Sequence, residues 1–496
     1  MNVRPFALAS LACCALLATE SAADSPRSPA EALAGLDPVF EKFMREQHIP
    51  GLVYGVVVDG RLARVRAFGV SNVPAGTPVT ADTAFRIASM TKQFTALATL
   101  RLRDAGKLSL DAPAEKYVPE MRQWRYPTSD SPKITVRDLL SHAAGLVTDD
   151  PWGDRQLAMS EGDFSRLVAA GVPFSRAPGM AYEYSNFGFT LAGRVVSNTS
   201  KTLYSRYITD SFLRPLGMQH TVWDYAAVPA GERAVGYRWE NEAWIEEPVL
   251  GPGAFGAMGG LITTANDYAR YVAWLLAAWP PRDGAEDGIL RRSSVREIAR
   301  PANYAVLRAA DDPSGCPRTQ SYGYAVIPFS DCVLGVHFGH SGGLPGYGSN
   351  VLFLPNRGVA VFAFANRTYA PASRVVREAA NLLAQSGAFP ERAGSPGPAL
   401  LDMARVVERI YAAGDVLSAP DKLAPNFLLD QTAAIRNPQL AELRKKHGEC
   451  RLADTQQSDN AMSATLAFTC DNGALKARVV LAPTTPSSMQ TLEFMP

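Results

Sequence analysis

Ser89 and Lys92 are the pair of side chains in this sequence whose types and spacing best suit covalent chemistry. They form the only S-x-x-K in the chain and stand at the start of a stretch with helical periodicity. Residues three apart share one face of a helix, so the lysine amine lies beside the serine hydroxyl. A serine with a neighbouring proton acceptor is the nucleophile of acyl-transfer enzymes, provided that burial or a nearby charge lowers the pKa of the lysine. The motif alone is weak evidence for a catalytic site, because a serine that caps a helix beside a solvated lysine gives the same sequence pattern.

Tyr184 and Asn186 form a second cluster of polar side chains. They follow Pro178-Gly179 and precede a stretch with helical periodicity, so they lie in a loop that can present a phenol and a carboxamide to one site. Tyr184 can act as a phenolate base near the lysine and later return the proton to the leaving group. Asn186 can bind the acyl amide of a substrate or hold Lys92. Two loop residues that cap the next helix are the structural alternative.

His340, Gly342 and Gly343 form the third cluster, at the end of a predicted strand. Small residues at this place allow a substrate to lie along the strand edge. The N–H of Gly343 can then complete an oxyanion hole with the N–H of Ser89, because backbone donors stabilise the charge that develops on an attacked carbonyl oxygen. His340 supplies a titratable donor that is usually neutral at pH 7.

Two other patterns have weaker support. Residues 339–343 also spell G-x-S-x-G, which would make Ser341 the nucleophile of a strand-turn-helix elbow, but another predicted strand follows it. The histidines lack the spacing of metal ligands, since His337 and His340 face opposite sides of a strand. We therefore expect neither a metal nor an organic cofactor.

A sheet and a helical region must bring the three clusters together. The sequence predicts an α/β chain of the α+β kind: an antiparallel sheet with halves distant in sequence, flanked by terminal helices, with a large and mainly helical insertion from Asp111 to about Thr264. An Asp-Gly pair at 59–60 predicts a hairpin between the first two strands. The candidate strands are 52–58, 62–70, 332–338, 349–354 and 358–365, and the candidate terminal helices are 37–47 and 372–385.

A second, smaller domain is expected at the C-terminus. Residues 387–398 are rich in Gly and Pro and are predicted to be a linker. About a hundred residues beyond it can fold on their own as an α+β domain, with a helix at 400–412 and strands near 450–453, 464–470, 475–481 and 489–494. The expected segments are a signal peptide (1–23), a main domain (24–386), the linker (387–398) and an accessory domain (399–496).

The composition fits a folded protein without a strongly charged partner. Of the 496 residues, 47% are hydrophobic and 20% are charged, which rules out a disordered or fibrous chain. A formal net charge of +1 gives no indication of a nucleic-acid partner. An apolar run from Phe6 to Ala18 after Arg4, with small residues before Asp24, is typical of a cleaved signal peptide. The run is too short to span a membrane, so we expect a periplasmic or secreted protein without stable membrane insertion.

Cysteine usage agrees with export. Two of the six cysteines lie in the signal segment, and the other four allow three pairings. We favour the pairing of nearest neighbours, because each pair flanks a plausible hairpin, and exported proteins commonly contain disulfides. The favoured disulfides are Cys316 with Cys332 and Cys450 with Cys470.

The three clusters, in this order, resemble the serine β-lactamase and penicillin-binding protein superfamily, in particular its class C-like branch. That branch also contains esterases, D-aminopeptidases and DD-carboxypeptidases. The similarity extends over about residues 37–385 and includes the phrases at 139–146 and 259–265. His142 belongs to the first phrase and is expected to pack structurally. The resemblance implies a β-lactamase/transpeptidase-like fold.

The resemblance also implies roles for the clustered residues. Ser89 becomes the nucleophile, Lys92 its partner, and Tyr184 and Asn186 the second motif. His340 and Gly342 match the first and third positions of a motif usually read Lys-Thr-Gly. Lysine there gives a permanent cation for the carboxylate of a penicillin, whereas histidine is largely neutral. The departure favours ester or peptide substrates that lack this carboxylate.

The leading hypothesis is a serine hydrolase that forms an acyl-enzyme on Ser89 and cleaves an ester or amide bond, whether peptide or β-lactam-like. Two alternatives remain open: a slow-acylating or non-turnover protein that binds penicillin or cell-wall peptides, and an acyltransferase. The expected partner is a small-molecule ester or a short peptide. The sequence does not determine the oligomeric state.

Overall fold

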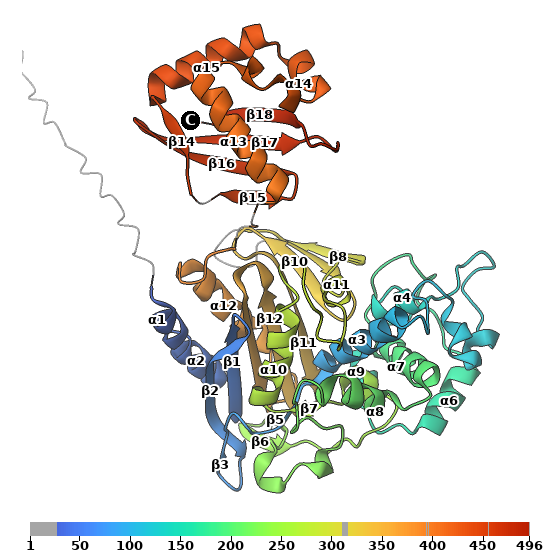
Figure 1. The fold of residues 1–496 in the computed structure, drawn as a ribbon. Coiled ribbons are helices and arrows are strands. Elements are labelled where there is room, and N and C mark those ends of the chain that lie inside the picture. The colour runs from blue at the N-terminus through green and yellow to red at the C-terminus, as the bar shows by residue number, and fades with distance from the viewer. Residues whose placement is uncertain (1–26, 310–315, 393, 395, 455, 496) are drawn as a thin grey trace, which may run out of the picture.

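A nine-stranded antiparallel sheet forms the framework of the larger part of the molecule (Figure 1). The structure is a computed structural model that describes residues 27–309, 316–392, 394, 396–454 and 456–495. The expected signal peptide, residues 1–23, lies outside the described residues. In spatial order the strands are β3 (Thr77–Pro78), β2 (Arg61–Asn72), β1 (Gly51–Val58), β13 (Val359–Ala365), β12 (Tyr347–Leu354), β11 (Gly335–Leu344), β10 (Ile327–Asp331), β9 (Arg318–Tyr322) and β8 (Asn303–Arg308).

The sheet joins strands from distant parts of the chain. β1 pairs with β13 in a continuous register from Leu52↔Ala365 to Val58↔Val359, so the prediction of one sheet with distant halves is confirmed. The predicted hairpin between β1 and β2 is also present. It turns at Asp59 and Gly60, whose φ angles of 50° and 76° are those of the turn type that matches strand twist.

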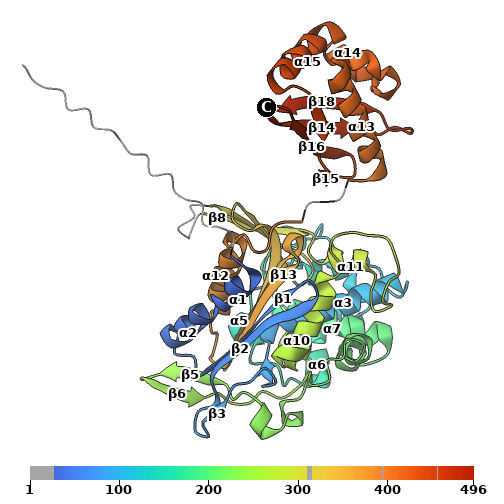
Figure 2. The ribbon, with the colours of Figure 1, turned by 60° about the vertical axis from the view of Figure 1, so that its left-hand side comes forward.

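Both faces of the sheet are buried, which explains the nearly unbroken apolar sequence of β13. Phe362 and Phe364 belong to the hydrophobic cluster on one face, and Val359 and Val361 to the cluster on the other, because side chains alternate along a strand. Figures 1 and 2 show the terminal helices on one face and α10 on the other. These helices are α1 (Pro29–Ala34), α2 (Asp37–Glu46), α12 (Ala372–Gln385) and α10 (Ala265–Leu276).

The segment between the two halves of the sheet is mainly helical, as predicted. It also contains the short strand pairs β4 (Phe85–Arg86) with β7 (Ile262–Thr263), and β5 (Tyr237–Glu240) with β6 (Ala243–Glu246). No helix in the described ranges is both long and apolar enough to cross a membrane. The remaining helices here are η1 (Ala88–Thr91), α3 (Lys92–Asp104), η2 (Ala114–Lys116), η3 (Pro119–Gln123), α4 (Val136–Leu140), α5 (Asp150–Gly153), α6 (Glu161–Ala170), α7 (Asn186–Ser200), α8 (Tyr204–Ile208), η4 (Thr209–Leu213), η5 (Tyr225–Ala227), η6 (Ala230–Glu232), α9 (Gly256–Gly259) and α11 (Arg292–Glu297).

One predicted strand, 332–338, is wrong in its boundaries. β10 ends at Asp331 and β11 begins only at Gly335. The Asp331 carboxylate accepts the N–H groups of Val333 and Leu334 at 3.0 and 2.8 Å, which makes a turn of the kind that aspartate favours. The apolar run that follows Asp331 concealed this turn, because its pattern is that of a buried strand.

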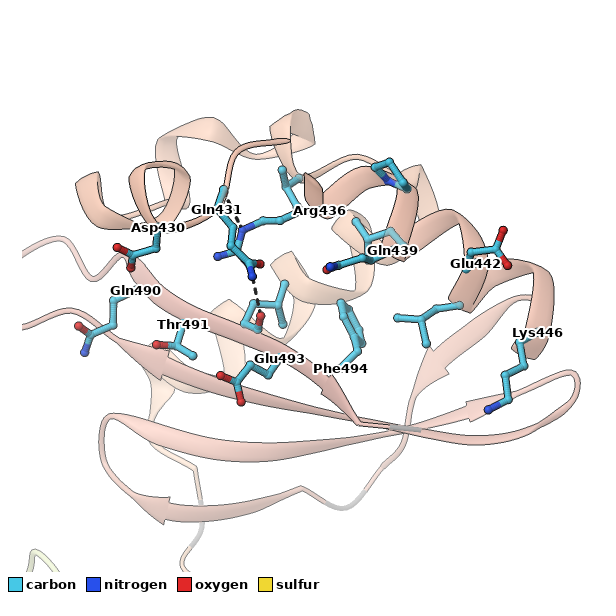
Figure 3. A pocket seen from close by; sticks show the side chains of 15 residues that line it. Asp430, Gln431, Arg436, Gln439, Glu442, Lys446, Gln490, Thr491, Glu493 and Phe494 are labelled. Carbon is cyan, nitrogen blue, oxygen red and sulfur yellow. Dashed lines mark hydrogen bonds between the residues drawn. The ribbon is translucent and has the colours of Figure 1, made fainter. Parts of the chain in front are cut away.

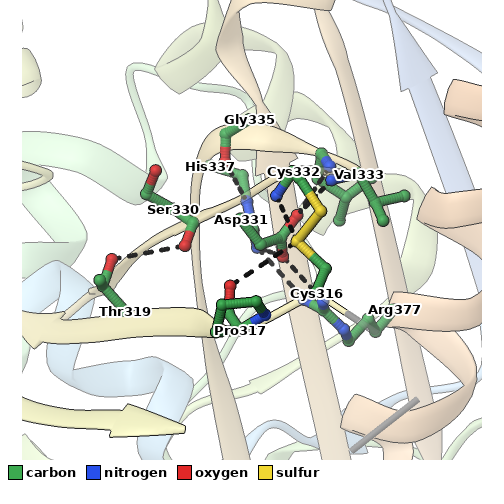
Figure 4. The surroundings of a disulfide bond; sticks show 11 residues. Cys316, Pro317, Thr319, Ser330, Asp331, Cys332, Val333, Gly335, His337 and Arg377 are labelled. Carbon is green, nitrogen blue, oxygen red and sulfur yellow. Dashed lines mark hydrogen bonds and ion pairs between the residues drawn. A yellow bond between two sulfur atoms is a disulfide. The ribbon is translucent and has the colours of Figure 1, made fainter. Parts of the chain in front are cut away.

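Both favoured disulfides are present. Cys316 and Cys332 join the two ends of the β9–β10 hairpin, next to the buried side chains of Asp331 and His337 and the half-buried Arg377 (Figure 4). Cys450 and Cys470 lie opposite each other on two paired strands of a second sheet. The first disulfide therefore ties down the chain just before β11.

The C-terminal residues form a five-stranded antiparallel sheet with a separate hydrophobic cluster. A hollow of about 1000 Å³ lies between α15 and β18, with charged and polar side chains along it (Figure 3). The helices are α13 (Pro398–Ala413), η8 (Val416–Ser418), η9 (Pro420–Lys422), α14 (Pro425–Asp430) and α15 (Ala433–His447), and the strands are β14 (Cys450–Leu452), β15 (Gln457–Asn460), β16 (Ser463–Cys470), β17 (Gly473–Leu481) and β18 (Met489–Met495).

Candidate active site

Ser89 and Lys92 lie on one helical turn where η1 runs into α3. The Lys92 Nζ donates a hydrogen bond to the Ser89 Oγ at 3.0 Å. Lys92 is fully buried, and Ser89 is 7% exposed. The predicted side-by-side placement of the hydroxyl and the amine is therefore present, and it differs from a solvated lysine beside a helix cap.

The segment before Ser89 is held from two sides. Ile87 donates its N–H to the Leu261 carbonyl at 3.1 Å, and its own carbonyl accepts the Ser349 hydroxyl at 2.8 Å. Ala88 has a φ of 49°, a left-handed conformation that costs free energy in a residue with a Cβ. Contacts with β12 and with the chain after α9 thus impose the backbone that aims Ser89.

Burial controls the protonation of Lys92. Loss of hydration lowers the pKa of Lys92 to about 8, although the carboxylates of Asp150, Asp154 and Asp149 act in the opposite direction. The amine also donates to the Asn186 Oδ1 at 2.7 Å and to the Met258 carbonyl at 3.0 Å. Because the desolvation effect is the larger one, a substantial fraction of Lys92 is neutral near pH 8.

Asn186 is the first residue of α7, and its side-chain amide is fully engaged within the protein. Its Oδ1 accepts from Lys92, and its Nδ2 lies 3.0 Å from Asp150 and 3.4 Å from Asp154 as a donor. Asp149 accepts the backbone N–H groups of Asn186 and of the next residue at 2.6 and 2.9 Å, as a carboxylate at a helix N-terminus does. Of the two expected roles of Asn186, this geometry favours holding Lys92.

The carboxyl group of Asp154 links Asn186 to a second segment of the site. Burial raises the pKa of Asp154 to about 7, while the charge of Lys92 lowers it. Tyr369 donates its hydroxyl to the other Asp154 oxygen at 3.0 Å. Among the described residues no group of three or more His, Cys, Asp or Glu has the arrangement of a metal site.

Tyr184 lies over the amine of Lys92, whose Nζ is 4.9 Å from the centre of the phenol ring. Burial raises the pKa of Tyr184 well above its ordinary value, and a hydrogen bond with Ser89 acts in the opposite direction. The phenol is consequently protonated at neutral pH. The Tyr184 phenol therefore contacts the hydroxyl of Ser89.

The second half of β11 presents a strand edge to the serine. β10 pairs with β11 only as far as Gly339, so residues 340–344 have β12 on one side and η1 on the other. A Cβ on Gly342 would lie 2.3 Å from the Ile87 carbonyl oxygen and 3.0 Å from the Ala88 Cβ. Gly342 therefore makes room for the segment that carries the serine. At Gly343 a Cβ would lie 2.7 Å from the ring of Tyr369.

His340 is buried, and other groups of the protein occupy both of its ring nitrogens. Its Nδ1 lies 2.6 Å from the Ser341 carbonyl, which can only accept, so Nδ1 carries the proton. Its Nε2 then accepts the Tyr322 hydroxyl at 2.8 Å. Desolvation and the charge of Lys92 lower the pKa of His340 to about 3. His340, which we expected to be a donor to the substrate, is neutral, and it already donates its one N–H to the Ser341 carbonyl in the same strand.

The structure excludes the elbow alternative at Ser341. This residue lies inside β11, opposite Asn350, and the strand continues to Leu344 without a turn into a helix. The strand-turn-helix context that G-x-S-x-G requires is absent from this described segment. The sequence already disfavours this alternative, because another predicted strand follows Ser341.

Several residues around the site were not found from the sequence. The acidic group Asp149, Asp150 and Asp154 was missed, and so were Tyr322 and Tyr369, because single aspartates and tyrosines in loops carry no distinctive pattern. The run Asp149-Asp150-Pro151 is a weak helix-start signal that could have indicated α5. Its proximity to Asn186 depends on tertiary folding.

The sheet, its helical insertion and the serine-lysine turn beside a strand edge define a serine β-lactamase-like fold. Residues 36–386 match the family model described as Beta-lactamase, which covers more than half of the chain. The chain belongs to this family of serine hydrolases.

Curated relatives are distant. The chain is 26% identical over 344 residues to Protein flp of Staphylococcus aureus strain MW2, covering 68% of this chain and 64% of that protein. It is 30% identical over 300 residues to Beta-lactamase-like protein 2 of Dictyostelium discoideum, covering 58% of this chain and 52% of that protein. The matches thus span less than two thirds of the length of these relatives.

Solved structures share the fold at low identity. The octameric penicillin-binding protein homologue from Pyrococcus abyssi has a TM-score of 0.59 at 20% identity, with 90% of this chain and 96% of that chain covered. A class C β-lactamase has a TM-score of 0.56 at 20% identity, with 71% of this chain and 96% of that chain covered. These likenesses support the fold.

The close packing at Gly342 leads to a testable prediction. Gly342→Ala should displace the segment before Ser89, because the new methyl group would overlap the Ile87 carbonyl, and such overpacking costs about 1–3 kcal/mol. We expect a lower midpoint of thermal unfolding. Gly162→Ala is the matched control, since its nearest neighbour would be 3.7 Å away. Equal midpoints for the two variants would contradict the prediction.

Proposed function

We propose that the protein is a serine hydrolase that forms an acyl-enzyme on Ser89 and cleaves an ester or amide bond. The observation that carries the proposal is the contact of a buried lysine amine with the serine hydroxyl at 3.0 Å, beneath the phenol of Tyr184. A nucleophile with an adjacent proton acceptor is the arrangement that covalent catalysis requires. Membership of the β-lactamase family supports the same reaction class.

In the proposed first step the neutral Lys92 takes the proton of Ser89 while Oγ attacks the carbonyl carbon of the substrate. The N–H groups of Ser89, at the start of a helix, and of Gly343, in β11, stabilise the oxyanion. The first N–H groups of a helix lack intrahelical partners, which leaves that of Ser89 available. Burial lowers the pKa of Lys92 and raises that of Tyr184, so near neutral pH the unprotonated amine is far more populated than the phenolate, and the amine is the available proton acceptor. Tyr184 then donates its proton to the leaving group and takes the proton held by Lys92. Water attacks the acyl group on Ser89, which leaves as an acid, and a proton of that water returns to the Ser89 oxygen.

We propose an ester without a carboxylate in its leaving group as the substrate class. His340 has no free nitrogen and no positive charge with which to bind a carboxylate. The amide of Asn186 is bound to Lys92 and to aspartates, so it is not available to an acyl amide unless these bonds break. Penicillins and peptides that end in D-alanine carry such a carboxylate, and we expect them to react more slowly.

The domain organisation and the compartment remain part of the proposal. We propose that residues 24–386 form the hydrolase domain, 387–398 a linker and 399–496 an accessory domain. The end of the family match at residue 386 and the separate hydrophobic cluster beyond residue 399 support these boundaries. Two disulfides support export to the periplasm or the medium.

The nucleophile can be tested directly with Ser89→Ala. We expect the variant to lose labelling by a fluorophosphonate probe and to lose at least about a thousandfold of the esterase activity, because no other hydroxyl contacts Lys92 in the described residues. Mass spectrometry of the wild-type protein should show an adduct on the peptide that contains residue 89. Unchanged labelling of the variant would reject the proposal, and an acyl adduct formed from an ester substrate that persists for hours would favour a binding protein.

The substrate class can be tested with a matched panel. We expect p-nitrophenyl acetate and butyrate to give kcat/KM values at least about tenfold above that of nitrocefin, because the neutral His340 offers no positive charge to the nitrocefin carboxylate. D-Ala-D-Ala peptides and D-amino-acid amides complete the panel. Nitrocefin hydrolysis faster than that of the esters would contradict the proposed substrate class.

The pH dependence of the reaction should follow Lys92. The fraction of Lys92 in its neutral form increases as pH rises through about 8. We therefore expect kcat/KM to rise with pH and to level off above this value. Asp150→Asn removes a negative charge that raises the pKa of Lys92, and the inflection should therefore move to lower pH. Asp130→Asn, on an exposed loop, is the control. A shift to higher pH, or equal shifts in both variants, would contradict this assignment.

A further inference from the structure

His142 holds the backbone on both sides of Tyr184. Its carbonyl accepts the N–H of Glu183 at 2.9 Å, and its ring Nδ1 accepts the N–H of Ser185 at 3.0 Å. The rings of His142 and Tyr184 also pack together, with their centres 4.2 Å apart. One residue thus contacts three consecutive residues of the loop that carries the phenol.

The bond to Ser185 fixes the tautomer of His142. A backbone N–H only donates, so Nδ1 must hold a lone pair and Nε2 must carry the proton. That Nε2 is buried and has no hydrogen-bond partner in the part of the chain that the structure describes. Burial and the charges of Lys92 and His340 hold the pKa of His142 well below its ordinary value. The other ionisable groups against its ring are Tyr182, Tyr184 and Tyr322.

Two features of His142 cost stability. Its φ is 56°, in the left-handed region, which is uncommon for any residue with a Cβ. On folding, its Nε2–H loses its hydrogen bond to water and gains no partner among the described residues. Such costs are retained where the surrounding structure needs a particular geometry, and they indicate a function.

We propose that His142 is a positioning residue that holds the phenol of Tyr184 on Ser89 and Lys92, as a neutral ring that accepts from Ser185 and packs against the phenol. The inference rests on the proposed function of the site. His142 is not placed to exchange protons with a substrate, since Nδ1 is occupied and its ring lies among aromatic side chains.

Two variants separate the acceptor from the ring. His142→Asn keeps a side-chain acceptor and tolerates the left-handed backbone, so we expect its kcat to stay within about tenfold of the wild-type value. His142→Phe keeps a ring but leaves the Ser185 N–H without its partner. We expect its kcat to fall about a hundredfold with little change in KM, because misplacement of a reacting group by about 1 Å has an effect of this size.

The pH profile distinguishes positioning from proton transfer. A neutral residue that only positions the phenol leaves the inflection near pH 8 in place, while the plateau falls. Loss or displacement of the inflection in the folded His142→Asn variant would show that His142 itself titrates in the reaction, which would overturn the inference. A lower unfolding midpoint together with wild-type kcat in His142→Phe would reduce His142 to a structural role and would also overturn it.

A measurement on the wild-type protein reports the tautomer of His142 directly. Nitrogen-15 NMR of its six histidines, with His142 assigned from its absence in His142→Asn, should show an unprotonated Nδ1 and a protonated Nε2 from about pH 5 to about pH 8. A protonated Nδ1, or an imidazolium in this range, would overturn the inference. Retained activity in Ser89→Ala would instead reject the proposed function and leave this tautomer result standing.

Discussion

The removal of one lysine amine from water is the constraint on which the rest of the site depends. Lys92 has no exposed surface, and its amine is held by a hydroxyl, a carboxamide and a carbonyl. An amine that donates three hydrogen bonds is satisfied while it is charged, but burial still favours its neutral form. Without this burial the serine beside it would have an ordinary solvated neighbour and no group to take its proton.

The fold supplies the contacts around that amine from regions far apart in the sequence. The hydroxyl comes from η1 just before α3, the carboxamide from the start of α7 and the carbonyl from α9. The later half of the sheet contributes β11 and β12, which hold the segment before Ser89 through Gly342 and Ser349. The large helical insertion and the sheet therefore share one site, and neither forms it alone.

Much of this arrangement could be predicted from the sequence, because it depends on local patterns. The helix after Ser89, the Asp-Gly hairpin, the boundaries of α12 and the pairing of the cysteines follow from periodicity, turn chemistry and spacing. The turn after Asp331 could not be predicted, because an apolar run masked it. Equally hidden were the partners of His340 and the aspartates around Asn186, since tertiary packing alone brings them together.

The pairing of β1 with β13 has a consequence for the order in which the molecule is assembled during synthesis. β1 is synthesised long before residues 359–365, which form β13. The two strands cannot pair until the whole helical segment between them has been made. Contacts between such distant residues form slowly, because the chain loses the entropy of closing a long loop before these contacts stabilise the fold. The nascent chain therefore has no completed sheet to hold the segment before Ser89 until the last strands of that sheet have been added.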